Sequence, residues 1–199
     1  MVEDHRVRRA TSADSETLSD VLARAFFDDP VLEWMYRGDR ARMRGGRSFF
    51  RRRLDDLLRD EDVFTTEGLA GAAVWAPPDR WHVELAQQLR LTHALALTGT
   101  RLPRVYAGFN LIERKHRSEP HYYLAVLGTD PLLQGRGVGS AVLRPILERC
   151  DRDGVPAYLE TAKERNIAFY ARHGFRVTEQ IQLPKGPPMW LMWRDPGAR

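Results

Sequence analysis

The sequence predicts an α/β domain, and three observations carry that prediction. The chain has 199 residues, the length of one ordinary domain, and 43% of them are hydrophobic, which suffices for a buried core. Its second half alternates between strand-like and helix-like hydrophobic periods. A glycine-rich turn separates the first strand of that half from its first helix. We therefore expect residues 1–199 to form a single domain.

The first 30 residues predict a short strand followed by a helix. Val7 lies in the strand, and Thr11 with Asp14 three positions later resembles a capping box, which satisfies backbone N–H groups at a helix start. Apolar residues then recur at helical spacing, at Leu18, Val21, Leu22, Ala25 and Phe26. The sequence Asp28-Asp29-Pro30 predicts the end of this helix.

The middle of the chain predicts helices and a hairpin. Residues 40–59 carry an amphipathic helical pattern. The period then changes to that of two strands, at 63–66 and 69–76, joined by a short turn. Helical patterns return at 83–98 and 102–114, where a glycine and a proline mark the break between them.

The remaining elements follow the order β-α-β-α-β-β. We expect a strand at 122–128, a glycine-rich turn at 134–139, a helix to about 153, a strand at 156–161, a helix at about 165–172, and strands at 175–183 and 189–193. An apolar stripe on the first of these helices predicts that it packs on the sheet. Cys150 belongs to that stripe and is interpreted as a core residue, since a nucleophilic cysteine would need a helix N-terminus or a nearby base.

The charge distribution does not indicate a nucleic-acid partner. The formal net charge is +4, from 31 Lys+Arg against 27 Asp+Glu. The densest basic run, Arg40 to Arg53, is followed directly by a run of carboxylates. It is interpreted as a solvated helix face with its counter-charges, so we expect no nucleic-acid partner.

Composition excludes several other classes of protein. No stretch approaches the roughly 18 consecutive apolar residues of a membrane helix, and the charged start predicts no secretory leader. The single cysteine cannot form an internal disulfide. The six histidines show no paired ligand spacing, so we expect no metal site and take His116 as isolated. These observations favour a cytoplasmic protein without membrane contact.

The segment from Gln134 to Ser140 predicts an anion-binding turn. Its three glycines let the backbone approach a ligand and point several N–H groups at one place, and the dipole of the following helix adds positive charge. A pyrophosphate fits such a place. No lysine follows the glycines as in a P-loop, and the G-x-G-x-x-G spacing of a dinucleotide fold is absent. A tight turn without a ligand is the structural alternative.

Two motifs in this order resemble the GCN5-related N-acetyltransferase (GNAT) family: Gln134-x-x-Gly137-x-Gly139, and Asn166-Ile-Ala-Phe-Tyr170-Ala-Arg-His-Gly174-Phe175. The resemblance covers residues 121–194. It implies the GNAT fold, a single mixed and mostly antiparallel sheet with a splayed parallel central strand pair, flanked by helices. Leu159-Glu160-Thr161 and the tail Gly186-Pro-Pro-Met-Trp look most like the puromycin N-acetyltransferase-like branch of the family.

The resemblance implies acetyl-CoA as cosubstrate and no metal. The pantetheine arm would pair with a strand edge at Leu127, Gly128 and Thr129. The pyrophosphate would rest on the glycine turn, made of Gln134, Gly135, Arg136, Gly137, Val138, Gly139 and Ser140. Asn166 would contact the coenzyme, although many family members carry that asparagine at the position of Lys163.

Acetyl transfer to an amine needs a base and an acid. An aliphatic ammonium has a pKa near ~10, so its proton must be removed, and the resemblance places Glu160 in that role. The alternative for Glu160 is an ion pair with Arg165 or a helix cap. The departing thiolate needs a proton, and the resemblance aligns Tyr170 with this role. The alternative for Tyr170 is a packed aromatic beside Phe169 and Phe175.

Two functions of different class are therefore compatible with the sequence. One is an acetyl-CoA-dependent N-acetyltransferase that moves the acetyl group to a primary amine of a small molecule by direct attack on the thioester. The other is a non-catalytic acyl-CoA-binding regulatory module of the same fold. The identity of the acceptor stays open, and so does the oligomeric state, a homodimer included.

Overall fold

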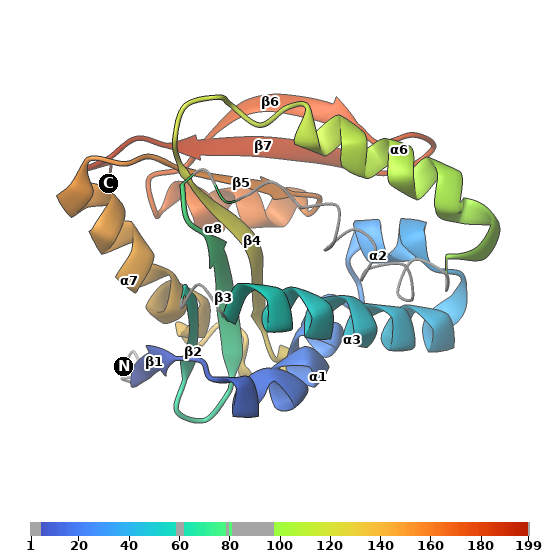
Figure 1. Ribbon diagram of the computed structural model, residues 1–199, viewed down its shortest axis with the longest axis horizontal. Helices are drawn as coiled ribbons and strands as arrows, with labels where there is room; N and C mark the ends of the chain where they lie inside the picture. The colour runs from blue at the N-terminus through green and yellow to red at the C-terminus, as the bar shows by residue number, and fades with distance from the viewer. Residues whose placement is uncertain (1–4, 59–61, 79, 81–97, 199) are drawn as a thin grey trace.

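One seven-stranded mixed sheet runs through the molecule, and helices cover both of its faces (Figure 1). The structure is a computed structural model and describes residues 5–58, 62–78, 80 and 98–198. The strand order is β1-β2-β3-β4-β5-β7-β6, and within this sheet only the β4–β5 pair is parallel. The predicted fold class is confirmed.

The observed elements match most of the predicted ones. The strands are β1 (Val7–Arg9), β2 (Val63–Thr66), β3 (Gly71–Ala76), β4 (Tyr122–Thr129), β5 (Ala157–Thr161), β6 (Arg176–Gln182) and β7 (Pro188–Arg194). The described α-helices are α1 (Ser15–Ala25), α2 (Pro30–Met35), α3 (Gly38–Leu57), α6 (Leu102–Glu113), α7 (Val138–Asp153) and α8 (Ile167–Ala171). The helix predicted at 83–98 lies outside the described residues apart from Thr98.

The sequence Asp28-Asp29-Pro30 begins a helix as well as ending one. α1 ends at Ala25, as predicted, but Pro30 then occupies the first turn of α2, which the sequence did not predict. Asp29 is the N-cap of α2, because its Oδ1 accepts a hydrogen bond from the N–H of Val31 at 2.9 Å. The cap fixes the carboxylate of Asp29 beside the end of α1.

Two apolar cores lie on opposite faces of the sheet. On one face, α1, α3 and α6 pack through residues such as Leu18, Phe50 and Val105. On the other face, α7 and α8 pack through residues such as Leu143 and Cys150. Cys150 is fully buried, and this burial raises the pKa of its thiol to about 12, so the prediction of a core cysteine is confirmed.

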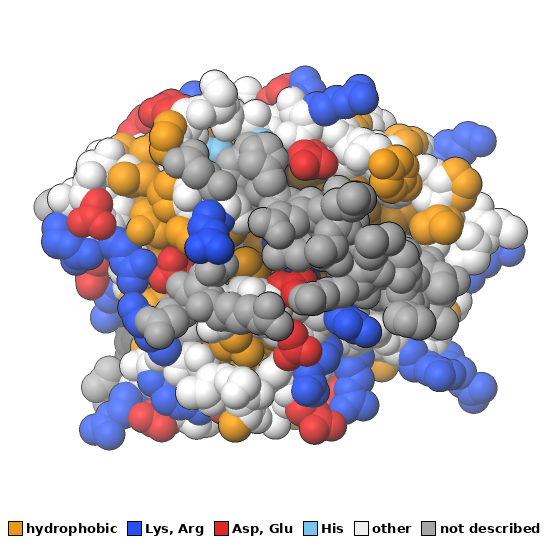
Figure 2. Space-filling model, in the orientation of Figure 1, with side chains coloured by type: hydrophobic (Ala, Val, Ile, Leu, Met, Phe, Trp, Pro, Cys, Tyr) orange, Lys and Arg blue, Asp and Glu red, His pale blue; other side chains and the backbone are white. Residues whose placement is uncertain are grey.

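Part of the basic run of α3 is paired with carboxylates. Three of its arginines lie in ion pairs with carboxylates of α1, α2 or α3 itself: Arg42 with Glu33, Arg47 with Asp20, and Arg51 with Asp55. Figure 2 shows Lys and Arg side chains spread around the edges of one face, with Asp and Glu beside many of them. Arg53 differs from these three arginines, because it is buried against the sheet.

A bulge in β4 changes the direction of the side chains that follow it. Val74 of β3 pairs with Val126 and Trp75 pairs with Leu124, so Ala125 is an extra residue on β4. Tyr122 and Leu124 belong to the core beneath α7, but Val126 belongs to the core beneath α1 and α3. The extra residue therefore reverses the alternation of faces along β4.

The parallel pairing of β4 with β5 stops where this bulge begins. Three pairs are formed, Tyr122 with Ala157, Tyr123 with Tyr158, and Leu124 with Leu159. β4 continues for five residues beyond the last pair while paired only with β3. The two central strands are thus splayed, as the resemblance implied.

We predict that Leu143→Ala lowers the free energy of unfolding by about 2–5 kcal/mol, because it removes a fully buried side chain of α7 and leaves a cavity. Leu132→Ala is the control, since Leu132 is 84% exposed, and it should change stability by no more than about 0.5 kcal/mol. Urea denaturation measures both values. Equal effects of the two substitutions would contradict the assignment of the α7 core.

Candidate active site

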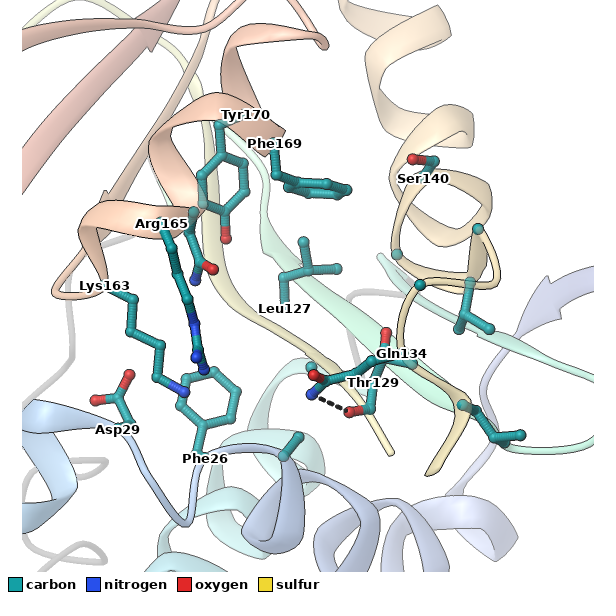
Figure 3. A pocket seen from close by; sticks show the side chains of 18 of the residues that line it. Phe26, Asp29, Leu127, Thr129, Gln134, Ser140, Lys163, Arg165, Phe169 and Tyr170 are labelled. Atoms are coloured by element: carbon teal, nitrogen blue, oxygen red, sulfur yellow. Dashed lines mark hydrogen bonds between the residues drawn. The ribbon is translucent and has the colours of Figure 1, made fainter. Parts of the chain in front are cut away.

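A cavity of about 420 Å³ lies beside the splayed end of β4. β4, the glycine turn, the first turn of α7, the segment before α8, α8 itself and the end of α1 all contribute to its wall (Figure 3). It brings together most residues that the sequence predicted for the coenzyme: Leu127, Gly128, Thr129, Gln134, Gly135, Gly137, Val138, Gly139, Ser140, Asn166 and also Tyr170. Two predicted residues, Arg136 and Glu160, do not line it.

The glycine turn has the backbone conformation that its glycines permit. Gly135 and Gly137 adopt φ values of +77° and +91°, in the left-handed region that favours glycine. Gly137 is the N-cap of the 16-residue helix α7, so the free N–H groups of the first turn of α7 lie at the cavity. Backbone N–H groups and the helix dipole favour an anion at this end.

Two side-chain contacts hold the turn against its neighbours. The amide nitrogen Nε2 of Gln134 donates a hydrogen bond to the carbonyl oxygen of Thr129 at 3.2 Å, which links the turn to the end of β4 (Figure 3). Ser140 Oγ lies 3.0 Å from Nε2 of His173, which links the start of α7 to the segment after α8. The turn is therefore fixed from both sides.

Arg136 contributes its backbone to the turn and does not line the cavity. Its carbonyl oxygen lies 2.9 Å from Nε2 of His5 near the N-terminus of the chain. The side chain of Arg136 therefore does not contribute to the wall of the cavity. The contact of Arg136 with His5 was not predicted from the sequence.

The edge of β4 at the cavity suits an extended ligand. Leu127, Gly128 and Thr129 pair with β3 on one side, and no described strand pairs with them on the other. A Cβ atom on Gly128 would lie 2.7 Å from Leu22 of α1, so a side chain at this position would push α1 away. A Cβ atom on Gly139 would lie 3.3 Å from the ring of Phe169. The glycines at these two positions therefore let α1 and Phe169 pack closely against the backbone that lines the cavity.

Tyr170 extends from α8 into the cavity (Figure 3). Its ring packs edge-on against Phe169 and Phe175, with centroid distances of 5.2 and 6.0 Å. Burial, with a contribution from the charge of Asp29, raises the pKa of Tyr170 above its ordinary value. The phenol therefore keeps its proton at neutral and moderately alkaline pH, so it can donate that proton or a hydrogen bond.

A charged wall of the cavity was not predicted from the sequence. Asp29, Lys163 and Arg165 line the cavity together (Figure 3). Burial raises the pKa of the Asp29 carboxyl. Lys163 and Arg165 both pair with the exposed carboxylate of Asp28, with N–O distances of 2.5 and 2.8 Å. These contacts cross about 135 positions of sequence, so no local pattern could have predicted them.

Glu160 lies on the opposite face of the sheet from Tyr170. Leu159 packs beneath α7, whereas Tyr158 packs beneath α3 and α6, and alternation along β5 puts Glu160 on the side of Tyr158. Glu160 is also the first residue of β5 beyond its last pair with β4. Its carboxylate therefore stands where the two central strands begin to separate.

The partner of Glu160 is a histidine. Nε2 of His116, three residues after α6, lies 3.1 Å from Oε1 of Glu160, and the two side chains are only 3% and 5% exposed. The expected alternative of an Arg165 pair is wrong, because Arg165 pairs with Asp28. The contact of His116 with Glu160 was not predicted from the sequence. The chain folds these residues together from positions 44 apart in the sequence.

Aromatic rings surround this pair. The ring of His116 lies 4.7 Å from those of both Tyr123 and Tyr158, edge-on in each case. Burial, and then the charge of Glu160, raises the pKa values of Tyr123 and Tyr158 well above that of an ordinary phenol. Both hydroxyls are therefore neutral at physiological pH, and that of Tyr123 hydrogen-bonds to Glu160.

Neither a metal cluster nor a membrane span is found in the described part of the chain. Within residues 5–58, 62–78, 80 and 98–198, no three His, Cys, Asp or Glu side chains lie together as metal ligands would. No helix in these ranges is both long and apolar enough to cross a bilayer.

The fold and the cavity define a class of protein. The mixed sheet, with a parallel central pair that separates beside the N-terminus of α7, is the arrangement that the resemblance to acetyltransferases implied. The model of the Acetyltransferase (GNAT) family matches residues 54–175. The chain belongs to this family, and it is an acetyltransferase; the family uses acetyl-CoA as its acetyl donor.

Three known proteins illustrate the relationship. An uncharacterized N-acetyltransferase of Schizosaccharomyces pombe is 26% identical over 212 residues, 95% of this chain and 83% of that protein. A crystal structure from Corynebacterium glutamicum, described as histone acetyltransferase HPA2 and related acetyltransferase, has a TM-score of 0.73 at 26% identity, with 98% of each chain covered. The N-alpha-acetyltransferase RimI of Mycobacterium tuberculosis is 33% identical over 105 residues, 50% of this chain and 65% of that protein.

We predict that Gly137→Val weakens acetyl-CoA binding at least about tenfold, which is about 1.4 kcal/mol, because a side chain there obstructs the N–H groups at the start of α7. Gly154→Val is the matched control. Gly154 is the left-handed cap at the other end of α7, with a φ of +68°, and it does not line the cavity. Calorimetry measures the affinities.

Both substitutions should cost a similar amount of stability, on the order of 1–3 kcal/mol, because both force a branched residue to a positive φ. Only Gly137→Val should lose affinity. Equal affinity losses in the two variants would show that general strain, and not the cavity, accounts for the loss.

Proposed function

We propose that the protein transfers the acetyl group of acetyl-CoA to a primary amine of a small molecule, by direct attack of the amine on the thioester. One observation carries the proposal: the β4–β5 pairing stops at Leu124 and Leu159, with the glycine-turn cavity on one side of the opening and Glu160 on the other. A thioester bound in the cavity would reach the opening from the side of Tyr170. The amine would approach from the side of Glu160.

Glu160 would accept the proton of the amine. An ammonium cannot attack a thioester, because its nitrogen has no free electron pair. The carboxylate of Glu160 is buried, and its Oε1 accepts no aligned hydrogen bond from the described residues. A buried oxygen without a donor is costly, and an ammonium would satisfy it. The carboxylate of Glu160 would then take the proton as the nitrogen forms its bond to the acetyl carbon.

Tyr170 would protonate the departing sulfur. As the tetrahedral adduct collapses, the carbon–sulfur bond breaks and its electron pair goes to sulfur. The phenol of Tyr170 is held in its protonated form and lines the cavity in which pantetheine would lie. It can therefore donate its proton to the thiolate.

The coenzyme would be held mainly by backbone groups. The pantetheine arm would pair with Leu127, Gly128 and Thr129, and the pyrophosphate with the N–H groups of the glycine turn. Asn166 lines the cavity and would add a side-chain contact. Lys163, which stands where many relatives carry asparagine, is engaged with Asp28 and would contribute positive charge to the cavity wall. No metal is required for these contacts.

A closer relationship with the puromycin N-acetyltransferase-like branch is part of this proposal. Its support is the sequence Leu159-Glu160-Thr161 and the tail that begins at Gly186. We also propose that residues 1–199 act as one domain. The buried position of Glu160 favours a slender alkyl or arylalkyl amine as acceptor.

An acceptor screen tests the proposed function. The protein is incubated with acetyl-CoA and a panel of amines, and free CoA is measured with a thiol reagent. The panel contains small primary amines and, because relatives are named for protein acetylation, short peptides with a free N-terminus or a lysine. Acetyl-CoA binding without CoA release on any amine would favour the regulatory module of the same fold.

We predict that Tyr170→Phe lowers kcat more than about tenfold with little change in acetyl-CoA affinity. The ring and its packing against Phe169 and Phe175 are kept, but the hydroxyl is lost, and general acid catalysis is typically worth about 10²- to 10⁴-fold. Tyr106→Phe is the control, since Tyr106 is 58% exposed on α6.

The pH profile gives a second measure of Tyr170. Because its pKa is raised, the wild-type rate should show no loss of this acid up to about pH 10, where an ordinary phenol ionises. Near-wild-type turnover of Tyr170→Phe would reduce the tyrosine to a packed aromatic.

We predict that Glu160→Gln lowers kcat/KM strongly at neutral pH and less at high pH. The loss should diminish as the pH approaches the pKa of the acceptor amine, near ~10, because free amine then forms without a base. Glu164→Gln, at an exposed position close by in the sequence, is the control and should follow the wild-type profile. A loss that is the same at every pH would assign Glu160 a structural role.

A further inference from the structure

We propose that His116 is a positioning residue for Glu160: it holds the carboxylate of Glu160 ionised and oriented toward the opening between β4 and β5. The inference rests on the proposed function, in which Glu160 is the base. It assigns a role to a histidine that no sequence motif indicated.

The geometry gives Glu160 one basic neighbour. Among the described residues, His116 is the only basic side chain in ion-pair contact with Glu160, with Nε2 and Oε1 3.1 Å apart. Burying a carboxylate in a region of low polarity disfavours its charged form unless a donor or a positive charge compensates. The imidazole can supply either, as an N–H donor when neutral and as a cation when protonated.

The position of His116 explains how it orients the carboxylate. His116 comes from the segment between α6 and β4, and Glu160 comes from β5, so the contact joins two parts of the chain beside the opening. With Oε1 beside the imidazole, the carboxylate is held next to the opening, where it can take the proton of the amine. Such contacts are often poorly aligned without substrate and tighten in the complex.

The other titratable groups around the pair supply no positive charge, although the phenol of Tyr123 also hydrogen-bonds to Glu160. The phenols of Tyr123 and Tyr158 stay neutral, because burial and the charge of Glu160 raise their pKa values. Burial lowers the pKa of His121, which lies beside His116 with a ring-centroid distance of 5.7 Å. Glu179 of β6 adds only negative charge and is paired with Lys115.

Among the residues that the structure describes, Arg53 is the remaining positive group that acts on Glu160. It projects from α3, is buried, and interacts electrostatically with Tyr123, Asp56 and Glu160. In the described part of the chain, Arg53 acts on Glu160 through its charge and is not within ion-pair distance of its carboxylate. Arg53 therefore supplies a background charge, whereas His116 supplies the contact. The experiment must separate these two contributions.

Three variants isolate the contribution of His116. His116→Leu removes the N–H donor and the charge, and His116→Gln restores an N–H donor on a side chain of similar reach. His121→Leu is the matched control, because His121 is also buried and packs on Tyr158, but its Nδ1 lies against the carbonyl oxygen of Glu119 at 2.7 Å. Thermal unfolding and acetyl-CoA affinity establish that each variant is folded.

The first readout does not depend on activity. The protein is labelled with ¹³C at glutamate carboxyls, the Glu160 signal is assigned by its loss in Glu160→Gln, and its titration is followed by NMR. In His116→Leu the titration midpoint should move up by about one pH unit or more, a tenfold change in proton affinity. His116→Gln should recover part of the shift, and His121→Leu should leave the midpoint in place.

The second readout uses the acceptor identified by the screen. The acid limb of kcat/KM should move to higher pH in His116→Leu, with a loss of at least about tenfold at pH 7 and a smaller loss at pH 9. In the Glu160→Gln background, His116→Leu should cause little further loss, because the two residues act as a unit.

An unchanged carboxyl titration in His116→Leu would overturn the inference and assign the compensation to Arg53. A shift in the titration of His121→Leu equal to that of His116→Leu would also overturn it, because general disturbance of the core would then explain both. If the carboxyl titration shifts as expected but no amine is acetylated by the wild-type protein, the proposed function fails and the His116–Glu160 coupling stands.

Discussion

The three residue pairs of the parallel β4–β5 contact are the constraint on which the rest of the site depends. A longer ladder would satisfy the edge of β4 from Ala125 to Thr129 and leave no strand edge for an extended ligand. A shorter one would let the central strands separate beneath the core. The bulge at Ala125 ends the ladder at a defined place, and the N-terminus of α7 and Glu160 lie on either side of the opening that results.

Local signals in the sequence predicted much of the fold and the part of the candidate site formed by the glycine turn and the end of β4. They did not predict the charged wall of the cavity or the partner of Glu160. Glycine conformation, capping residues and hydrophobic periods are properties of neighbouring residues, so the glycine turn, α7 and the strands around it followed from the sequence. The helix α2 was missed because Asp29 and Pro30 serve both as a stop and as a start. The helix predicted at 83–98, which lies outside the described residues apart from Thr98, and the role of Arg136 as a ligand residue stay predictions.

The residues that the sequence could not bring together meet through tertiary contacts. His116 and Glu160 are separated by 44 positions, and Asp28 lies about 135 positions from Lys163. Their meeting depends on how α6 crosses the sheet and how the end of α1 faces the segment before α8. Those packing angles come from the shape of two cores and leave no period in the sequence.

The bulge at Ala125 also has a consequence for how the protein can evolve, because it places the two parts of the site on opposite faces of the sheet. The glycine turn, at the start of α7, and Glu160, beside Tyr158, lie on opposite faces of the sheet. Under the proposed function, substitutions on α3 or α6 would alter the choice of acceptor while the glycine turn keeps its shape. A lineage that inherits this arrangement would then be able to change the molecule it modifies without rebuilding the turn proposed to hold the donor.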